Sequence, residues 1–178
     1  MFERLSIPTP FQVGPVNAYV AGRTLVDPGP DSEEAWSALL DRLEARDLAP
    51  GDVEQVLVTH PHPDHFGLAA RLRDAGARVV ASEAATPIVE DFPGRLADEQ
   101  RYFRDFFERC GMDLTTAKTV TNLPQAFLEY APSVAVDRSV TTGDSLVVAD
   151  TTVTVDAVTG HADGEILFEY EAGDDLVA

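Results

Sequence analysis

Three of the four histidines of this chain lie in one short segment, Thr59-His60-Pro61-His62-Pro63-Asp64-His65, and the fourth is His161. The segment directly follows Val56-Leu57-Val58, an apolar run that is typical of a buried strand, and it precedes a stretch that is predicted to be helical. Open α/β sheets place their ligand sites in loops that follow buried strands. The pattern therefore predicts an α/β fold with a site at the carboxyl end of this strand.

The spacing of the histidines indicates metal binding. Each of the two prolines favours extended backbone at the residue before it, which is His60 or His62. Residues two apart in an extended segment point the same way, so these two rings can bind one cation together. Asp64 and His65, at the turn into the helix, can bind a second ion nearby. Imidazole and carboxylate suit zinc, and also iron or manganese. The alternative, a helix-capping Asp64 among surface histidines, accounts poorly for three histidines together.

Strand and helix patterns alternate through the first half of the chain, as in α/β proteins. A helix begins after Asp31 or Ser32, either of which can cap it, and a second begins near Phe66. Asp27 lies in a Pro-Gly turn, where aspartate commonly bonds to the local backbone. Short strands are predicted at 17–20, 23–26, 53–59, 77–81, 145–148, 152–158, 166–170 and 176–178. We expect residues 1–178 to form a single domain.

Residues from about 84 to 132 differ from their surroundings and are predicted to be a helical insertion within this domain. Phe103, Phe106, Phe107 and Cys110 recur at helical spacing, so we expect them to pack in the core. The alternative is that part of this stripe lines a substrate cleft.

The composition excludes several classes of protein. The chain has 31 acidic and 13 basic residues, a net charge of −18, and this argues against binding to nucleic acid. No apolar run reaches the roughly 18 residues of a membrane span, and no signal peptide is visible, so we expect a cytoplasmic protein. A single cysteine excludes an intramolecular disulfide. Because Lys118 is the only lysine, the acidity suggests adaptation to a high-salt cytoplasm; the alternative is an ordinary solvated surface.

The residues from Thr59 to Gly67 resemble the His-x-His-x-Asp-His signature of the metallo-β-lactamase fold superfamily. Asn17-Ala18-Tyr19-Val20 and the turn at Asp27-Pro28-Gly29 resemble elements that precede this signature in the family. Gly160-His161-Ala162-Asp163-Gly164 resembles the Gly-His-x-x-Gly element that follows it. The resemblance runs from about residue 10 to the C-terminus, is weakest in the helical middle, and implies an αββα sandwich.

The resemblance also implies roles for these residues. His60, His62 and His161 would bind the first metal, and Asp64 and His65 the second. A metal-bound hydroxide would attack a carbonyl group, with Asp64 as the catalytic residue that orients the water. The implied cofactor is one or two zinc ions, with iron or manganese possible. Asp27 is expected to be a structural residue that can also orient a ligand histidine by contacting the side of its ring away from the metal.

The sequence departs from the family pattern towards its C-terminus. Glu165 stands where a second histidine often occurs. Neither the bridging aspartate nor the final histidine is found before Ala178, so we expect the C-terminal part of the fold to be missing, through a cut or a short gene. Asp174 and Asp175 are predicted to be turn residues. Metal occupancy is therefore expected to be nearer one ion than two.

The function that the sequence favours is zinc-dependent hydrolysis of a small-molecule ester, thioester or lactone. One alternative is an iron-dependent enzyme similar to persulfide dioxygenases. Another is a truncated metal-binding domain without turnover. The expected partner is a small-molecule substrate, with no nucleic acid and no membrane, and the sequence does not predict the oligomeric state.

Overall fold

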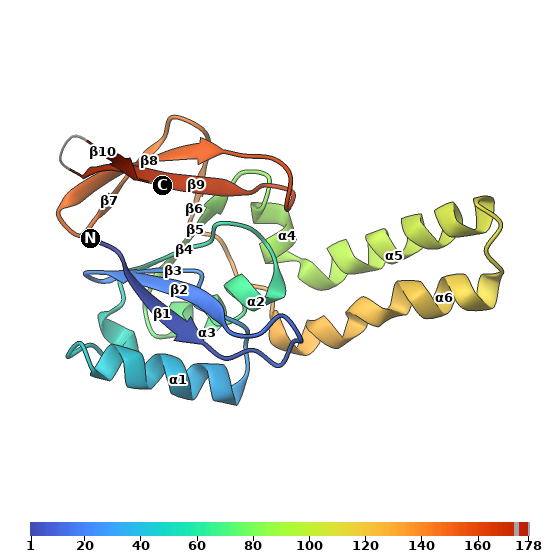
Figure 1. Ribbon diagram of the computed structural model, residues 1–178, viewed down its shortest axis with the longest axis horizontal. Helices are drawn as coiled ribbons and strands as arrows, with labels where there is room; N and C mark the ends of the chain where they lie inside the picture. The colour runs from blue at the N-terminus through green and yellow to red at the C-terminus, as the bar shows by residue number, and fades with distance from the viewer. Residues whose placement is uncertain (173–174, 178) are drawn as a thin grey trace.

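The computed structural model describes the backbone of residues 1–172 and 175–177, which form two β-sheets packed face to face (Figure 1). The first sheet has the order β1-β2-β3-β4-β5-β6, and its strands are β1 (Glu3–Ile7), β2 (Val16–Ala21), β3 (Thr24–Val26), β4 (Gln55–Leu57), β5 (Arg78–Ser82) and β6 (Arg138–Val140). The second has the order β10-β9-β8-β7, and its strands are β7 (Ser145–Val148), β8 (Thr151–Ala157), β9 (Ile166–Ala172) and β10 (Asp175–Val177).

Parallel pairing brings the ends of the central strands to one edge of the first sheet. The strands β1, β2 and β3 are antiparallel, whereas β3 to β6 are parallel neighbours. In the register of the parallel part, Leu25 lies opposite Val56, which lies opposite Val79. Parallel strands run the same way, so the residues that follow β3, β4 and β5 meet at the same edge.

Both faces of the first sheet are buried. Successive side chains of a strand point to opposite faces, so Leu57 joins a cluster between the sheets while Val56 joins a cluster under the outer face. The outer face is covered by α1 (Glu33–Glu44) and α3 (Ala69–Asp74) (Figure 1). Of the two predicted caps, Ser32 is the one that caps α1, because its Oγ accepts a hydrogen bond from the Ala35 N–H at 3.1 Å.

The structure is the mixed α/β sandwich that the sequence predicts. The helix expected near Phe66 is two short helices, α2 (Pro63–Phe66) and α3, and a short 3-10 helix η1 (Pro50–Asp52) precedes β4. In the part of the chain that the structure describes, the outer face of the four-stranded sheet has no helix, and no helix is long and apolar enough to cross a membrane. Asp174 lies outside the described residues, as does the side chain of Asp175.

Helices occupy the segment between β5 and β6, where the sequence predicts an insertion. They are α4 (Thr86–Glu90), α5 (Phe92–Arg109), α6 (Leu114–Asn122) and the 3-10 helix η2 (Leu123–Tyr130). The helices α5 and α6 lie side by side and project from the body of the molecule; we call α5 and α6 the arm (Figure 1). Asp91 caps α5 and Asp113 caps α6, each through its carboxylate.

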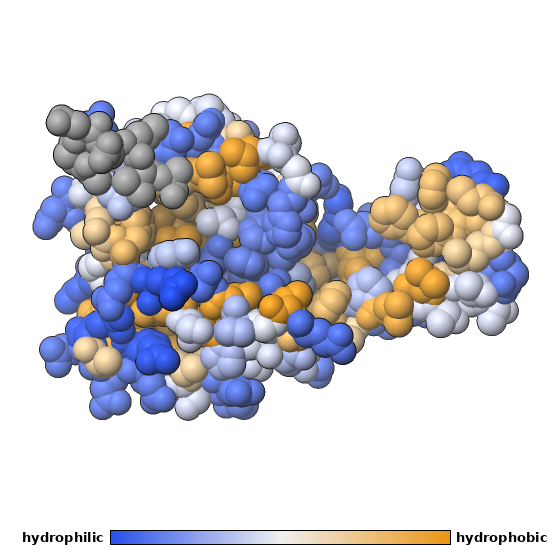
Figure 2. Space-filling view, in the orientation of Figure 1, coloured by the Kyte–Doolittle hydropathy of each residue, from blue (hydrophilic) through white to orange (hydrophobic). Residues whose placement is uncertain are grey.

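The prediction of core packing for the aromatic stripe of α5 is wrong. Phe103 and Phe106 are 44% and 41% exposed, Phe107 is half-buried, and Cys110 is exposed at the end of the helix. Figure 2 shows apolar side chains on the surface of the arm. Helical periodicity identifies residues that share a face. It does not show whether another element covers that face, and here the arm projects beyond the sheets.

Candidate metal centre

The candidate site lies where the parallel strands end. Asp27 follows β3, and Thr59 and His60 follow β4. The loop between β8 and β9 carries His161 to the same edge, because the Ile166 N–H at the start of β9 donates to the Thr59 carbonyl oxygen at 2.9 Å. A segment about one hundred residues farther along the chain is thereby fixed beside the histidine loop.

His60, His62 and His161 form one cluster. One ring nitrogen of each lies within 4.8 Å of the others, and the ring centroids are 4.6 to 4.8 Å apart. Ligand atoms around a tetrahedral zinc ion, at bond lengths near 2.0–2.1 Å, are about 3.4 Å from one another. Small rotations of the three side chains would therefore bring their nitrogens to zinc-binding distances. His60 is buried and His161 is exposed, so the cluster opens towards solvent on the side of His161.

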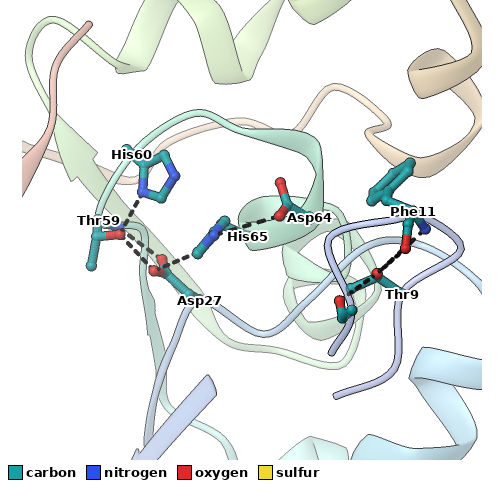
Figure 3. Close-up of polar contacts among 8 residues, drawn as sticks. Thr9, Phe11, Asp27, Thr59, His60, Asp64 and His65 are labelled. Atoms are coloured by element: carbon teal, nitrogen blue, oxygen red, sulfur yellow. Dashed lines mark hydrogen bonds and ion pairs between the residues drawn. The ribbon is translucent and has the colours of Figure 1, made fainter. Parts of the chain in front are cut away.

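The hydrogen bonds of His60 show which ring nitrogen is free (Figure 3). The Thr59 hydroxyl lies 2.5 Å from Oδ2 of Asp27 and 2.9 Å from Nδ1 of His60. A carboxylate only accepts, so the single hydroxyl proton goes to Asp27, and Nδ1 of His60 must donate its own proton to Thr59. Nε2 then carries a lone pair. It is buried and has no hydrogen-bond partner among the described residues, which is the environment expected of a metal ligand.

Asp27 organises a second cluster next to the first. Its buried carboxylate accepts hydrogen bonds from the Thr59 N–H at 2.8 Å and from the Nδ1–H of His65 at 2.9 Å. Nε2 of His65 is 3.7 Å from Oδ2 of Asp64 (Figure 3). That separation is close to the one expected for two ligands of a single ion, so His65 and Asp64 can share a metal.

The backbone at Asp27 is unusual. Its φ of +49° lies in the left-handed region, which aspartate tolerates better than most residues, and its N–H donates to the Leu57 carbonyl oxygen at 3.0 Å. This conformation turns the chain at the end of β3 and directs the carboxylate towards Thr59 and His65.

The electrostatics of the cluster favour neutral imidazole rings at His60 and His62. Burial, together with the smaller effects of the neighbouring His65, His62 and His161 rings, lowers the pKa of His60 to about 3. Burial also lowers the pKa of His62, with His161 as the next cause. Burial alone would lower the pKa of His65 as well, but the hydrogen bond and charge of Asp27, together with the charge of Asp64, outweigh it and raise that pKa. Since a metal binds the neutral ring, the lowered values fit a metal site.

The structure thus brings His60, His62 and His161 into one cluster and places Asp64, His65 and Asp27 beside it; that they bind metal stays a prediction. Glu165 does not join this cluster, and its carboxylate accepts the His161 N–H at 3.4 Å instead.

Two positioning side chains are not apparent from the sequence. One is Thr59. The other is Ser82 at the end of β5, which donates to the Gly164 carbonyl oxygen at 2.7 Å and accepts from the Ala85 N–H at 3.0 Å. Gly164 has a φ of +75°, and a Cβ there would lie 2.5 Å from the Ala85 nitrogen, so the loop that carries His161 packs tightly against this corner. A serine at a strand end gives no sequence signal of this role.

A cavity of about 380 Å³ opens beside the cluster, and His62 and Asp64 form part of its wall. Phe92 and Leu96, from the first turns of α5, also line it. Phe103, Phe106 and Phe107 are not among its lining residues, so this part of the stripe does not line the cavity.

A two-sheet α/β sandwich with clustered histidines at the ends of its parallel strands defines a class of metal-binding folds. Comparison with known proteins identifies the family: the family model described as metallo-beta-lactamase superfamily matches residues 12–178. The chain belongs to this superfamily.

Three relatives illustrate the similarity. The probable metallo-hydrolase YqjP of Bacillus subtilis (strain 168) is 31% identical over 126 residues, which are 69% of this chain and 39% of that protein. A metallo-beta-lactamase family protein of Thermus thermophilus is 29% identical with a TM-score of 0.75, over 95% of this chain and 55% of that one. A beta-lactamase domain protein of Burkholderia ambifaria is 25% identical with a TM-score of 0.69, over 99% and 53%. The chain therefore spans 39% to 55% of the length of these relatives.

Proposed function

We propose that this chain forms the metal-binding part of a zinc-dependent hydrolase that acts on a small-molecule ester, thioester or lactone. The observation that supports this most is the environment of His60. Its Nδ1–H is bound to Thr59, and its Nε2 is buried beside His62 and His161 without a hydrogen-bond partner in the described part of the chain. A lone pair held in this way fits a metal and little else.

The donor set favours zinc. His60, His62 and His161 would hold the first ion, and Asp64 with His65 would contribute to a second position. Three imidazoles are an established zinc ligand set, whereas non-haem iron oxygenases typically use two histidines and a carboxylate. A bound divalent metal supplies Lewis acidity and lowers the pKa of water enough to give a nucleophile near neutral pH.

Asp64 would orient the attacking water. Its carboxylate is half-buried and lines the cavity next to His62. A carboxylate accepts hydrogen bonds only, so Asp64 can direct the lone pair of a water towards a carbonyl carbon and take up a proton at the oxygen that does not bind metal. Addition of the water and cleavage of the C–O or C–S bond would release an acid and an alcohol or thiol. The net charge of −18 supports a small-molecule substrate over nucleic acid.

The test is a substrate panel with metal-loaded protein. The 178-residue chain is loaded with zinc or with iron and offered esters, thioesters, lactones and persulfides. We expect hydrolysis with zinc, and loss of most of it in His62→Ala, whose folding is checked by circular dichroism. Turnover of a persulfide with iron alone would favour the oxidative alternative. Bound zinc without turnover of any ester, thioester or lactone would favour a metal-binding domain that is not catalytic.

A further inference from the structure

The cavity beside the histidine cluster has walls from five separate parts of the chain. One wall is the histidine loop itself, with His62 and Asp64. The others come from the loop after β1, from α4 and the start of α5, from η2, and from the loop between β8 and β9. Figure 3 shows Phe11, in the loop after β1, on the other side of Asp64 from Asp27. The cavity thus lies next to the position where a substrate carbonyl would have to bind.

Apart from the metal-ligand candidates, the walls are mostly apolar. Phe11 packs edge-on against Phe127 of η2, with ring centroids 5.1 Å apart, and both rings line the cavity. Ile88, Phe92 and Leu96 form the wall on the side of α4 and α5 and are themselves nearly buried. These side chains offer no hydrogen bonds to a ligand, so they favour an apolar group.

The described residues that line the cavity include no free cationic side chain. Among the described residues that line the cavity, Arg95 is the only arginine or lysine. Its guanidinium is held by two carboxylates, with Nε 2.7 Å from Oε1 of Glu99 and an Nη 2.9 Å from Oδ2 of Asp163. With Asp64 included, the lining carries more negative than positive charge. In the part of the cavity away from the metal position, a carboxylate or phosphate on a substrate would therefore be repelled and would find no free cationic side chain among the described lining residues.

We propose that this cavity binds an uncharged, apolar acyl or aryl group, so that the substrates are esters or thioesters of neutral hydrophobic acids. This inference rests on the hydrolase function proposed above and adds the class of acid to it. The volume of about 380 Å³ is within the range of small-molecule sites, and it accommodates a chain of several carbons.

The first test compares acyl groups on a common thiol, with zinc-loaded protein. Acetyl, butyryl and hexanoyl thioesters should show kcat/KM rising about fourfold for each buried methylene group. The succinyl thioester has the same chain length as the butyryl one and ends in a carboxylate. We expect its kcat/KM to be at least about tenfold lower. Equal or faster turnover of the succinyl thioester would overturn the inference and leave the hydrolase function in place.

A substitution at the rim of the cavity provides a second test. Val13 lines the cavity, lies in a loop and is 73% exposed, so the fold should tolerate Val13→Arg. The new free cation should raise the ratio of succinyl to butyryl turnover about tenfold. The control is Val120→Arg, which adds the same charge on α6 at a residue that does not line the cavity, and it should leave the ratio unchanged. An equal change in both variants would contradict the proposal.

Binding without turnover separates this inference from the proposed reaction. Hexanamide and its analogue with a terminal carboxylate, adipamic acid, are titrated into zinc-loaded protein and followed by ligand-observed NMR. Preferential binding of hexanamide, with no hydrolysis of any thioester, would support the apolar cavity and refute the reaction. Absence of hexanamide binding, or preference for adipamic acid, would refute the apolar cavity.

Discussion

Thr59 joins two parts of the candidate metal centre. Its hydroxyl accepts from His60 and donates to Asp27, while its backbone N–H donates to the other oxygen of Asp27. Asp27 in turn accepts from His65. The Thr59 hydroxyl group therefore sets the tautomer of His60, and the Asp27 carboxylate that accepts its proton also orients His65. Partners of this kind typically change metal affinity when they are removed.

We predict that Thr59→Val lowers zinc affinity by about 10- to 100-fold. Valine has nearly the same shape as threonine but cannot accept the Nδ1–H of His60, so the ring loses the contact that keeps its Nε2 free. The measurement is competition with a chromophoric chelator. Thr59→Ser retains the hydroxyl group and is the matched control, expected to bind zinc nearly as tightly as the wild type. Equal affinities of Thr59→Val and the wild type would show that the hydroxyl group does not fix the ring.

At this scale the sequence predicts the candidate metal ligands, but not the hydrogen bonds that orient them. His60, His62, Asp64 and His65 stand out because they are close together after a buried strand, and close spacing is visible in a sequence. The contact between Asp27 and Thr59 joins residues that are 32 positions apart and depends on parallel pairing of β3 with β4. No local pattern encodes such a contact.

At the scale of the elements, phenylalanine side chains on the arm and on α2 differ in how far they are buried. Phe66, at the end of α2, is fully buried and lies 5.7 Å from Phe92 between ring centroids. Phe106, on α5, lies 6.5 Å from Tyr102 and 5.9 Å from Phe107 between ring centroids, and it is 41% exposed. Two phenylalanines of the same size therefore have very different environments.

We predict that Phe66→Ala lowers the free energy of unfolding by about 3–5 kcal/mol, because it removes a buried ring and leaves a cavity. Phe106→Ala, the matched control on the arm, should cost about 1 kcal/mol or less, since much of its ring is already in water. Urea denaturation at neutral pH gives both values. A cost for Phe106→Ala as large as that for Phe66→Ala would mean that the face of the arm is covered in solution.

The junction of β5 and β6 depends on a carboxylate. Oδ2 of Asp137 accepts the Val79 N–H at 2.8 Å, Oδ1 accepts from Arg73 of α3 at 3.0 Å, and the Asp137 N–H donates to the Val79 carbonyl oxygen. The hydrogen bond from Val79, followed by that from Arg73, holds the pKa of Asp137 below its ordinary value. Asp137 thus extends the pairing of β5 with this segment by one residue, to the position just before β6 begins at Arg138.

We predict that Asp137→Ala costs about 1 kcal/mol of stability at neutral pH and much less at low pH. A carboxyl group whose pKa is lowered by folding stabilises the protein above its unfolded pKa of about 3.9, and this contribution disappears as the pH falls through the folded value. Urea denaturation from neutral pH down to about pH 3 measures the difference. Asp150→Ala, at an exposed position in the turn after β7, is the control and should show little effect at any pH. A difference that stays constant over this range would contradict the assignment.

The positions of helices and strands are predicted better than the burial of their faces by other elements. The runs around Val56 and Val79 give the parallel strands, and the spacing after Ser32 gives α1, because periodicity and caps are local. The sequence wrongly predicts a buried stripe at Phe103 and Phe106, because burial depends on whether another element lies over that face. The sandwich of two sheets follows from the family resemblance and not from periodicity alone.

For the whole molecule, the dominant electrostatic property is its net charge of −18. Mutual repulsion of surface carboxylates destabilises a compact state, and the range of that repulsion falls from about 10 Å at 0.1 M salt to about 3 Å at 1 M. We therefore predict that the melting temperature rises between dilute buffer and about 1 M KCl, as expected of a protein adapted to high salt. Thermal denaturation followed by circular dichroism measures this. A constant or lower melting temperature in KCl would argue against that adaptation.

The central claim is that His60, His62 and His161 together hold a metal ion. The most direct measurement is elemental analysis of the 178-residue chain after loading with zinc and exhaustive dialysis. The account predicts about one tightly bound ion per chain, lost in His62→Ala, because the cluster offers three nitrogens whereas Asp64 and His65 offer only two ligands at the second position. Wild-type protein that retains no zinc, or a His62→Ala variant that retains as much as the wild type, would contradict it.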